Sequence, residues 1–89
     1  MKKLALNSGI LMELPELPPK QYRQVVGAIF DLLNDSRPHY SKPLSGSPYL
    51  RLAVGEYRVI YRNDDETVHV VLVGKRNDSK VYRALQRKP

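Results

Sequence analysis

Arginine and tyrosine side chains in the second half of the chain are the groups best suited to chemistry. Residues 45–89 hold six arginines and three lysines. A guanidinium presents a planar fork of donors that matches phosphate oxygens, and an aromatic ring can stack on a base. The four residues singled out for such a site are Arg51, Arg58, Arg76 and Tyr82. They predict a phosphate-bearing partner, for which the alternative is a basic face that only keeps the protein soluble.

The composition describes one small basic domain and excludes several kinds of catalysis. The 89 residues (10.2 kDa) are enough for a single core, so residues 1–89 are expected to form one domain. The formal charge is +6, the sequence pI is about 9.8, and 42% of the residues are apolar. The absence of cysteine excludes disulfides and thiolate chemistry, and His39 and His69 are not at metal-ligand spacing. We therefore expect neither a metal site nor a small-molecule cofactor.

The apolar segments are too short to cross a membrane. No window approaches the roughly 20 apolar residues that a spanning helix requires. Two lysines precede a short apolar run at the start, but Asn7, Ser8 and Glu13 interrupt that run and no small-residue cleavage site follows. We therefore expect a cytoplasmic protein with no membrane partner.

The first half of the chain predicts a strand followed by two helices. Lys2–Leu6 is typical of a short terminal strand, and Ser8 is a candidate cap for a brief helix that runs to Glu13. Pro19 is well placed to open a longer helix that ends near residue 34. Seven apolar residues recur in this helix at three- and four-residue spacing and are expected to belong to the core: Tyr22, Val25, Val26, Ile29, Phe30, Leu32 and Leu33.

The second half predicts three consecutive strands after a loop rich in serine and proline (residues 36–48). The strands are Tyr49–Val54, Tyr57–Arg62 and Thr67–Lys75, and residues 78–87 are expected to form a short helix or an extended tail. The third strand is apolar on both faces, which places it inside the sheet. The fold class is therefore α+β: a small antiparallel sheet, made of the C-terminal three-strand meander and the N-terminal strand, packed on two N-terminal helices.

Strand alternation predicts which side chains share a face of this sheet. The apolar sets of the first two meander strands face the core: Leu50, Leu52 and Val54, and Tyr57, Val59 and Tyr61. Arg58, Ile60 and Arg62 then lie outside. A hairpin loop centred on residues 54 and 55 places Arg51 directly across from Arg58, about 5 Å away. Like charges repel at that distance, which favours an anion shared by the two arginines over a purely solvated pair.

The end of the third strand requires an irregularity. Simple alternation would put Arg76 on the core side with Leu72, where a charge is not acceptable. The strand is therefore expected to end or bulge at Gly74. A bulge would turn Arg76 towards the other two arginines, and Tyr82, six residues later, is near enough to reach the same rim.

Two other groups of polar residues have an ordinary structural interpretation. Asp64, Asp65 and Glu66 have the residue types of a metal cluster, but adjacent acids between two strands are typical of a hairpin loop. His69 shares the alternation of Arg58, so a substrate contact is open to it, although a structural role is the favoured interpretation.

The stretch YLRLAVGEYRVIY (Tyr49 to Tyr61), followed by LVGKRNDSKVY (Leu72 to Tyr82), resembles the RelE branch of the RelE/ParE toxin superfamily. These proteins are the toxins of bacterial toxin–antitoxin pairs. The resemblance implies a ribosome-dependent, metal-independent endoribonuclease that inhibits translation by cutting mRNA, with the ribose 2′-OH attacking the adjacent phosphate. It also implies a cognate acidic antitoxin, the ribosome and mRNA as partners. Such an antitoxin would pair with the cationic site and cover an apolar rim that includes Ile60.

By position, the resemblance assigns the reaction to Arg58, Arg76 and Tyr82. Arg51 stands where the best-studied branch has a lysine, and Tyr49 where it often has another. Because an arginine has a pKa above about 12, Arg51 can stabilise charge but cannot accept a proton. The base is then Glu56, Tyr82, or a group of the ribosome or substrate. The residues expected to contact RNA are Tyr49, Lys75, Lys80 and Arg83.

Two other functions remain open. A gyrase inhibitor related to ParE would act by binding a protein rather than by cleaving RNA. The GKR segment (residues 74–76) and Tyr82 argue against that mode, which needs no basic and aromatic phosphate site. A catalytically weak relative that only binds its antitoxin is suggested by the arginine in place of lysine at position 51.

Overall fold

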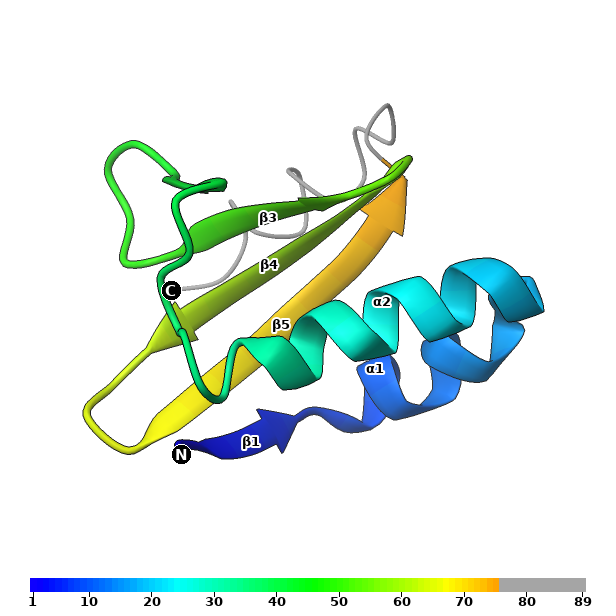
Figure 1. Ribbon diagram of the computed structural model, residues 1–89, viewed down its shortest axis with the longest axis horizontal. Helices are drawn as coiled ribbons and strands as arrows, with labels where there is room; N and C mark the ends of the chain where they lie inside the picture. The colour runs from blue at the N-terminus through cyan, green and yellow to red at the C-terminus, as the bar shows by residue number, and fades with distance from the viewer. Residues whose placement is uncertain (76–89) are drawn as a thin grey trace.

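The computed structural model describes residues 1–75, which form two α-helices, a short 3₁₀ helix and five strands (Figure 1). In chain order the elements are β1 (Lys3–Leu6), α1 (Ser8–Glu13), η1 (Leu14–Glu16), α2 (Pro19–Asp31), β2 (Ser41–Pro43), β3 (Leu50–Val54), β4 (Tyr57–Asn63) and β5 (Thr67–Lys75). The α+β class is confirmed, as are both helices and the three-strand meander. No helix among these residues is long and apolar enough to span a membrane. The segment predicted at residues 78–87 lies outside the described residues.

The five strands form one mixed sheet in the order β1-β5-β4-β3-β2. β3, β4 and β5 are antiparallel neighbours, and β5 lies inside the sheet as its two apolar faces predict. β1 pairs with β5 in parallel, so the prediction of an entirely antiparallel sheet is wrong. Side-chain alternation is the same in either strand direction, so the sequence pattern does not distinguish the two. β2 is a short edge strand within the predicted loop, where Pro43 is tolerated because an edge strand has a free side.

Helix boundaries depend on the groups that satisfy the free N–H and C=O groups at each end. α1 begins at Ser8, one residue earlier than a Ser8 cap predicts, because its cap is Asn7, whose side-chain oxygen accepts the Ile10 N–H at 2.8 Å. α2 ends at Asp31, before the predicted end near residue 34. Tighter bonds from the N–H groups of residues 33 and 34 to carbonyls three residues back replace the α-helical pattern there.

The hydrophobic core lies between the helices and one face of the sheet. α2 contributes Val25, Ile29 and Leu32, each at most 2% exposed. The buried strand residues include the following predicted ones: Leu50, Leu52, Tyr57, Val59, Tyr61, Val68 and Val70. The Tyr61 hydroxyl donates to the Ser36 carbonyl oxygen at 3.0 Å, which ties the loop after α2 to the sheet. Burial raises the pKa of Tyr61, so this hydroxyl remains a donor.

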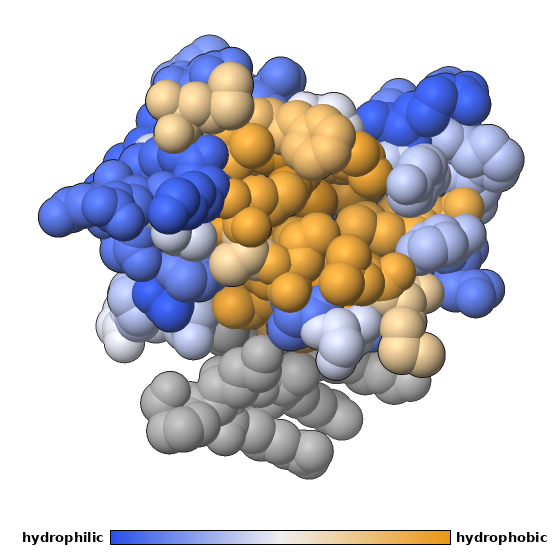
Figure 2. All heavy atoms as spheres, turned by 90° about the horizontal axis from the view of Figure 1, so that it is seen from below, coloured by the Kyte–Doolittle hydropathy of each residue, from blue (hydrophilic) through white to orange (hydrophobic). Residues whose placement is uncertain are grey.

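Only part of the apolar stripe of α2 is buried. Tyr22 and Phe30 are 39% and 55% exposed, so the prediction that all seven apolar residues belong to the core is wrong for these two. They lie on the side of the helix next to the buried residues, and the sheet does not extend far enough to cover that side. Figure 2 shows that apolar residues form a broad field on the lower face of the molecule.

A buried residue of α2 and its exposed neighbour form a matched pair for testing this division of the helix. Ile29→Ala removes a packed side chain and leaves a cavity, so we expect the free energy of unfolding to fall by about 2–5 kcal/mol. Phe30→Ala should lower it by no more than about 1 kcal/mol, because more than half of the side chain is already exposed. Urea unfolding followed by circular dichroism measures both. Equal losses would contradict the assignment of Ile29 to the core and Phe30 to the surface.

Candidate functional site

The β3–β4 hairpin decides where the predicted arginines lie. Its loop has two residues, Gly55 and Glu56. Arg51 therefore pairs with Ile60, and Arg58 pairs with residue 53. The predicted direct pair of Arg51 and Arg58 is wrong: the two are diagonal neighbours, roughly 7–8 Å apart. Gly55 has a φ of 57°, which glycine adopts without strain, and this centres the turn one residue later than predicted.

A bulge in β5 changes which of its residues face the core. Ile60 pairs with Leu72, but the next residue of β4 pairs with residue 70, which leaves Val71 unpaired. Beyond the bulge Val73 packs against the core, and Leu72 shares the face of Ile60. The predicted irregularity thus lies at Val71 rather than at Gly74, and the strand continues to residue 75. The residues around Val71 are all apolar, so their side-chain types do not show that the bulge lies at Val71 rather than at Gly74.

The face of the sheet turned away from the helices carries a group of cationic residues. Arg51, Arg58 and Arg62 lie on it by strand alternation, and we call it the arginine face. Lys42 of β2 pairs directly with Arg51 and so joins them. All four side chains are exposed or half-buried. Sequence patterns miss Lys42, because three residues are too few to show an alternation.

Arg58 is held in place by the hairpin turn. Its Nη1 donates to the carbonyl oxygens of Tyr57 at 2.8 Å and Gly55 at 3.2 Å. A guanidinium has five N–H donors, so the rest of the fork can contact a phosphate. Anchoring of this kind reduces the conformational freedom that the side chain loses when it binds an anion.

Ile60 is fully buried, although alternation puts it on the arginine face. The prediction of an exposed apolar rim at this residue is therefore wrong. Arg51 and Leu72 pair with it from either side, and long side chains such as arginine cover apolar neighbours with their stems. Ile60 therefore offers no exposed apolar contact on the arginine face.

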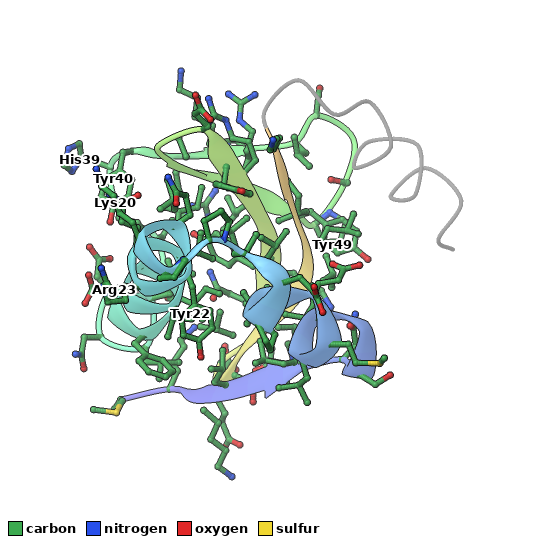
Figure 3. The ribbon with its side chains drawn as sticks, turned by 90° about the vertical axis from the view of Figure 1, so that its right-hand side faces the viewer. Lys20, Tyr22, Arg23, His39, Tyr40 and Tyr49 are labelled. Atoms are coloured by element: carbon green, nitrogen blue, oxygen red, sulfur yellow. The ribbon has the colours of Figure 1, made fainter. Side chains whose placement is uncertain are left out.

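Tyr49 lies just before β3, on the alternation of Arg51. It is half-buried and, with Arg37 and Asn63, lines a shallow hollow of about 240 Å³. Figure 3 shows it on the opposite side of the strands from Lys20 of α2. This aromatic residue is therefore on the side of the arginine face. It lies four residues before Ala53, which pairs with Arg58 in the hairpin.

The other predicted site residues stand apart from this group or lie outside the described residues. Lys75 is exposed and pairs with Tyr57, which puts it on the alternation of the core-facing residues at the end of β5. Arg76, Lys80, Tyr82 and Arg83 lie outside residues 1–75. Their roles stay predictions, as does contact of Lys75 with RNA.

The acidic loop between β4 and β5 is the hairpin loop that the sequence predicts. Asp64 Oδ1 accepts the backbone N–H groups of Glu66 and Thr67, at 2.9 and 2.7 Å. Its Oδ2 lies 2.9 Å from His69 Nε2, so the histidine is tied to the loop. The bond from His69, together with the two backbone bonds, lowers the pKa of Asp64 to about 2. Within residues 1–75, no three potential ligands are grouped so as to hold a metal ion.

The model of a known protein family matches most of this chain. The model of the family described as the ParE toxin of the type II toxin–antitoxin system, parDE, matches residues 6–79. The chain belongs to the RelE/ParE toxin superfamily. None of the curated proteins matches it in sequence.

Solved structures place this toxin in the RelE branch of the superfamily. A mutant of the E. coli toxin RelE in the free state is 28% identical with a TM-score of 0.77, over 99% of this chain and 98% of that one. A chain of the RelBE2 toxin–antitoxin complex from Mycobacterium tuberculosis is 30% identical with a TM-score of 0.72, over 86% and 93%. The archaeal RelE–RelB complex from Pyrococcus horikoshii OT3 shares the fold, with a TM-score of 0.76 at 21% identity over 85% and 96%.

Two positions separate this RelE-like toxin from the pattern that it resembles: Arg51 stands where the best-studied RelE branch has a lysine, and Tyr49 where it often has another. The β2–β3 pairing brings Lys42 directly beside Arg51 on the same face. A lysine is therefore present next to these arginines, although it comes from a neighbouring strand.

The hydrogen bonds to Asp64 predict how the stability of the toxin depends on pH. The pKa of this carboxyl group is about 2 in the folded chain against an ordinary 3.8, so the bonds contribute stability above about pH 4. That contribution is lost as the pH falls towards about 2. Asp64→Asn removes it, so the melting temperature of this variant should fall less steeply between these pH values than that of the wild type. Asp65→Asn, the matched control, should follow the wild type; equal slopes for all three would contradict the role given to Asp64.

Proposed function

We propose that the chain is a ribosome-dependent endoribonuclease, which cuts mRNA and so inhibits translation as the toxin of a toxin–antitoxin pair. The observation that supports this most directly is the shared face of Arg51 and Arg58, with Lys42 and Arg62 beside them. Cations on one sheet face repel one another, and a polyanion lying across them relieves that repulsion. The resemblance to the RelE branch supplies the reaction class.

The proposed reaction uses the ribose as the nucleophile. Its 2′-oxygen forms a bond to the adjacent phosphorus while the bond from phosphorus to the 5′-oxygen breaks, which leaves a 2′,3′-cyclic phosphate. The 2′-OH gives up its proton and the departing 5′-oxygen takes one, so a free 5′-OH results and no water is consumed. Negative charge increases on the phosphate in the transition state, and fixed guanidinium groups stabilise that charge.

Each cationic residue has its own task in this proposal. Arg58, anchored at the hairpin through Nη1, acts with Arg76 to neutralise the pentavalent phosphate and its leaving oxygen. Arg51, diagonal to Arg58, holds the flanking phosphate, and Lys42 extends the same contact. Tyr82 orients the reacting nucleotide or stacks on its base.

The proton acceptor is not an arginine, because a guanidinium stays charged at every relevant pH (pKa above about 12). Lys42 and Glu56 are near these arginines, and both side chains can exchange a proton. Lys42 pairs with Arg51 across two strands, and Glu56 is exposed in the hairpin loop that anchors Arg58. Tyr82 and groups of the ribosome or of the substrate are the other candidates.

We further propose that a cognate acidic antitoxin, the ribosome and mRNA are the partners and that the toxin acts in the cytoplasm. Complexes of RelE with the antitoxin RelB, from E. coli and from P. horikoshii, support the antitoxin by analogy. The net charge of +6 favours an acidic chain as antitoxin and a polyanion as target.

A second candidate function is inhibition of gyrase through protein binding. One observation favours it: the family model that matches residues 6–79 is that of the ParE toxin. A gyrase inhibitor of this kind needs no phosphate site, so it would not depend on Arg58.

Loss of the anchored arginine tests the proposed function in cells. Expression of the wild type should arrest growth and produce new mRNA 5′ ends in phase with codons. Arg58→Ala should reduce cleavage about 100- to 1,000-fold and permit growth, because it removes a contact made in the transition state. Arg76→Ala and Tyr82→Ala should behave in the same way. Lys20→Ala, which removes an exposed cation of α2 on the other side of the strands, is the control and should arrest growth like the wild type.

The same experiment separates the alternatives. Codon-phased cuts that require Arg58 support the endoribonuclease. DNA damage without mRNA cuts, with Arg58→Ala as toxic as the wild type, would instead identify a gyrase inhibitor. A wild type that neither arrests growth nor cuts mRNA would be the relative that only binds its antitoxin.

A further inference from the structure

α2 carries a second apolar stripe beside the one that packs on the sheet. Tyr22, Val26 and Phe30 recur at four-residue spacing, which places them along one side of the helix, and Leu33 follows in the turn directly after its end. Tyr22 and Phe30 are 39% and 55% exposed, and the other two are half-buried. The sheet covers the neighbouring stripe, so this one remains at the surface.

The outermost strand of the sheet continues this apolar strip. Leu4 and Leu6 of β1 pair with two buried valines of β5, which fixes their side chains on the helix side of the sheet. The two elements meet where the Lys2 N–H donates to the Leu33 carbonyl oxygen at 2.9 Å. Figure 2 shows the continuous apolar field on this side of the molecule. We call the following six residues the α2–β1 surface: Leu4, Leu6, Tyr22, Val26, Phe30 and Leu33.

One end of the α2–β1 surface is hollowed. Pro15, Leu17, Pro19 and Tyr22 line a shallow depression of about 280 Å³. Depressions lined by apolar side chains receive the anchoring side chains of a partner, and such anchors contribute most of the binding energy of an interface.

The dimensions of the α2–β1 surface suit a single helix. From Tyr22 to Leu33 the chain advances eleven residues, or about 17 Å of α-helix. A partner helix of about 12 residues would lie beside α2 and above β1, and so extend the helix layer over the edge of the sheet. A helix of that length is only marginally stable alone in water, so it would order as it binds, as segments of partly disordered partners do.

A basic residue borders the α2–β1 surface on its outer side. Arg23 follows Tyr22 and precedes Phe30 by seven residues, so it lies at the outer margin of the stripe. A border of this sign favours acidic residues beside the partner's apolar stripe. A second copy of this chain, with its net charge of +6, would bring like charge to the same border.

We propose that the α2–β1 surface docks an acidic amphipathic helix of the antitoxin. The identity of the partner rests on the proposed function, whereas the chemistry of the helix follows from the surface itself. Leu4 and Leu6 face the helix side of β1, so this contact is separate from the arginine face on the other side of the sheet. This helix of the antitoxin would hold the toxin without itself occupying the phosphate site.

A synthetic helix tests the docking directly and does not depend on RNA cleavage. The probe is a labelled 14-residue peptide with leucines at positions i, i+4, i+7 and i+11 and glutamates at most other positions. We expect fluorescence anisotropy to show that the wild type binds it at least tenfold more tightly than a scrambled peptide of equal composition. Phe30→Asp should weaken binding at least tenfold. Tyr40→Asp, a matched change at a residue that is 46% exposed in the loop before β2, should leave binding unchanged.

A second pair of variants tests the basic border. Arg23→Glu should weaken binding of the probe severalfold, and Lys20→Glu, one turn earlier on α2, should have little effect. Thermal unfolding checks that each variant is folded.

Three results would overturn the docking proposal. The first is that the wild type binds the probe and the scrambled peptide equally, and the second is that the wild type and Phe30→Asp bind the probe equally. The third is that the wild type is a dimer which Phe30→Asp separates into monomers, because this would assign the surface to a second copy. The two proposals can fail separately. If the wild type binds the probe more tightly than the scrambled peptide but never cuts mRNA, the docking surface is supported and the endoribonuclease is contradicted.

Discussion

The register of the β3–β4 hairpin is the constraint on which the rest of the molecule depends. Side chains alternate with a period of two, so a shift of one residue in the pairing would put Leu52 on the same face as Arg58 and turn the apolar set of one of the two strands away from the core. The positive φ of Gly55 excludes that shift by placing the turn at residues 55 and 56. The hydrophobic core under the helices and the arginine face on the other side are therefore two consequences of one turn.

Two surfaces of this small domain are unfavourable in isolation, and both make sense once a partner is present. Lys42 lies directly across from Arg51, and like charges in that position destabilise a sheet. More than half of the Phe30 side chain is exposed to water. A domain with a margin of about 5–15 kcal/mol tolerates such features because burial of residues such as Ile29 and Tyr61 offsets them. A bound polyanion would remove the first cost, and a docked apolar helix would remove the second.

Sequence patterns predict the elements of this fold better than their pairing. The strand at Thr67–Lys75 has the predicted bounds, and the first helix ends at Glu13 as predicted, because apolar period and helix-ending signals are local. The arginine register depends on which residue opens the turn, and that is decided by the backbone angle of Gly55. The bulge at Val71 lies in an entirely apolar run with no contrast to mark it. The sequence does not predict the exposure of Phe30, because an apolar period identifies the stripe on a helix but not the width of the sheet that covers it.

The central claim is that guanidinium groups on one sheet face stabilise the charge that develops as a ribose 2′-OH attacks its own phosphate. The most direct test uses purified ribosomes that carry mRNA with a single 2′-deoxynucleotide at the mapped cut site. We expect the wild-type protein to cut the all-ribose message, leaving a 2′,3′-cyclic phosphate, and to leave the deoxy message intact at that position. Cleavage of the deoxy message at the same position would contradict the account, because no 2′-oxygen would be present to attack.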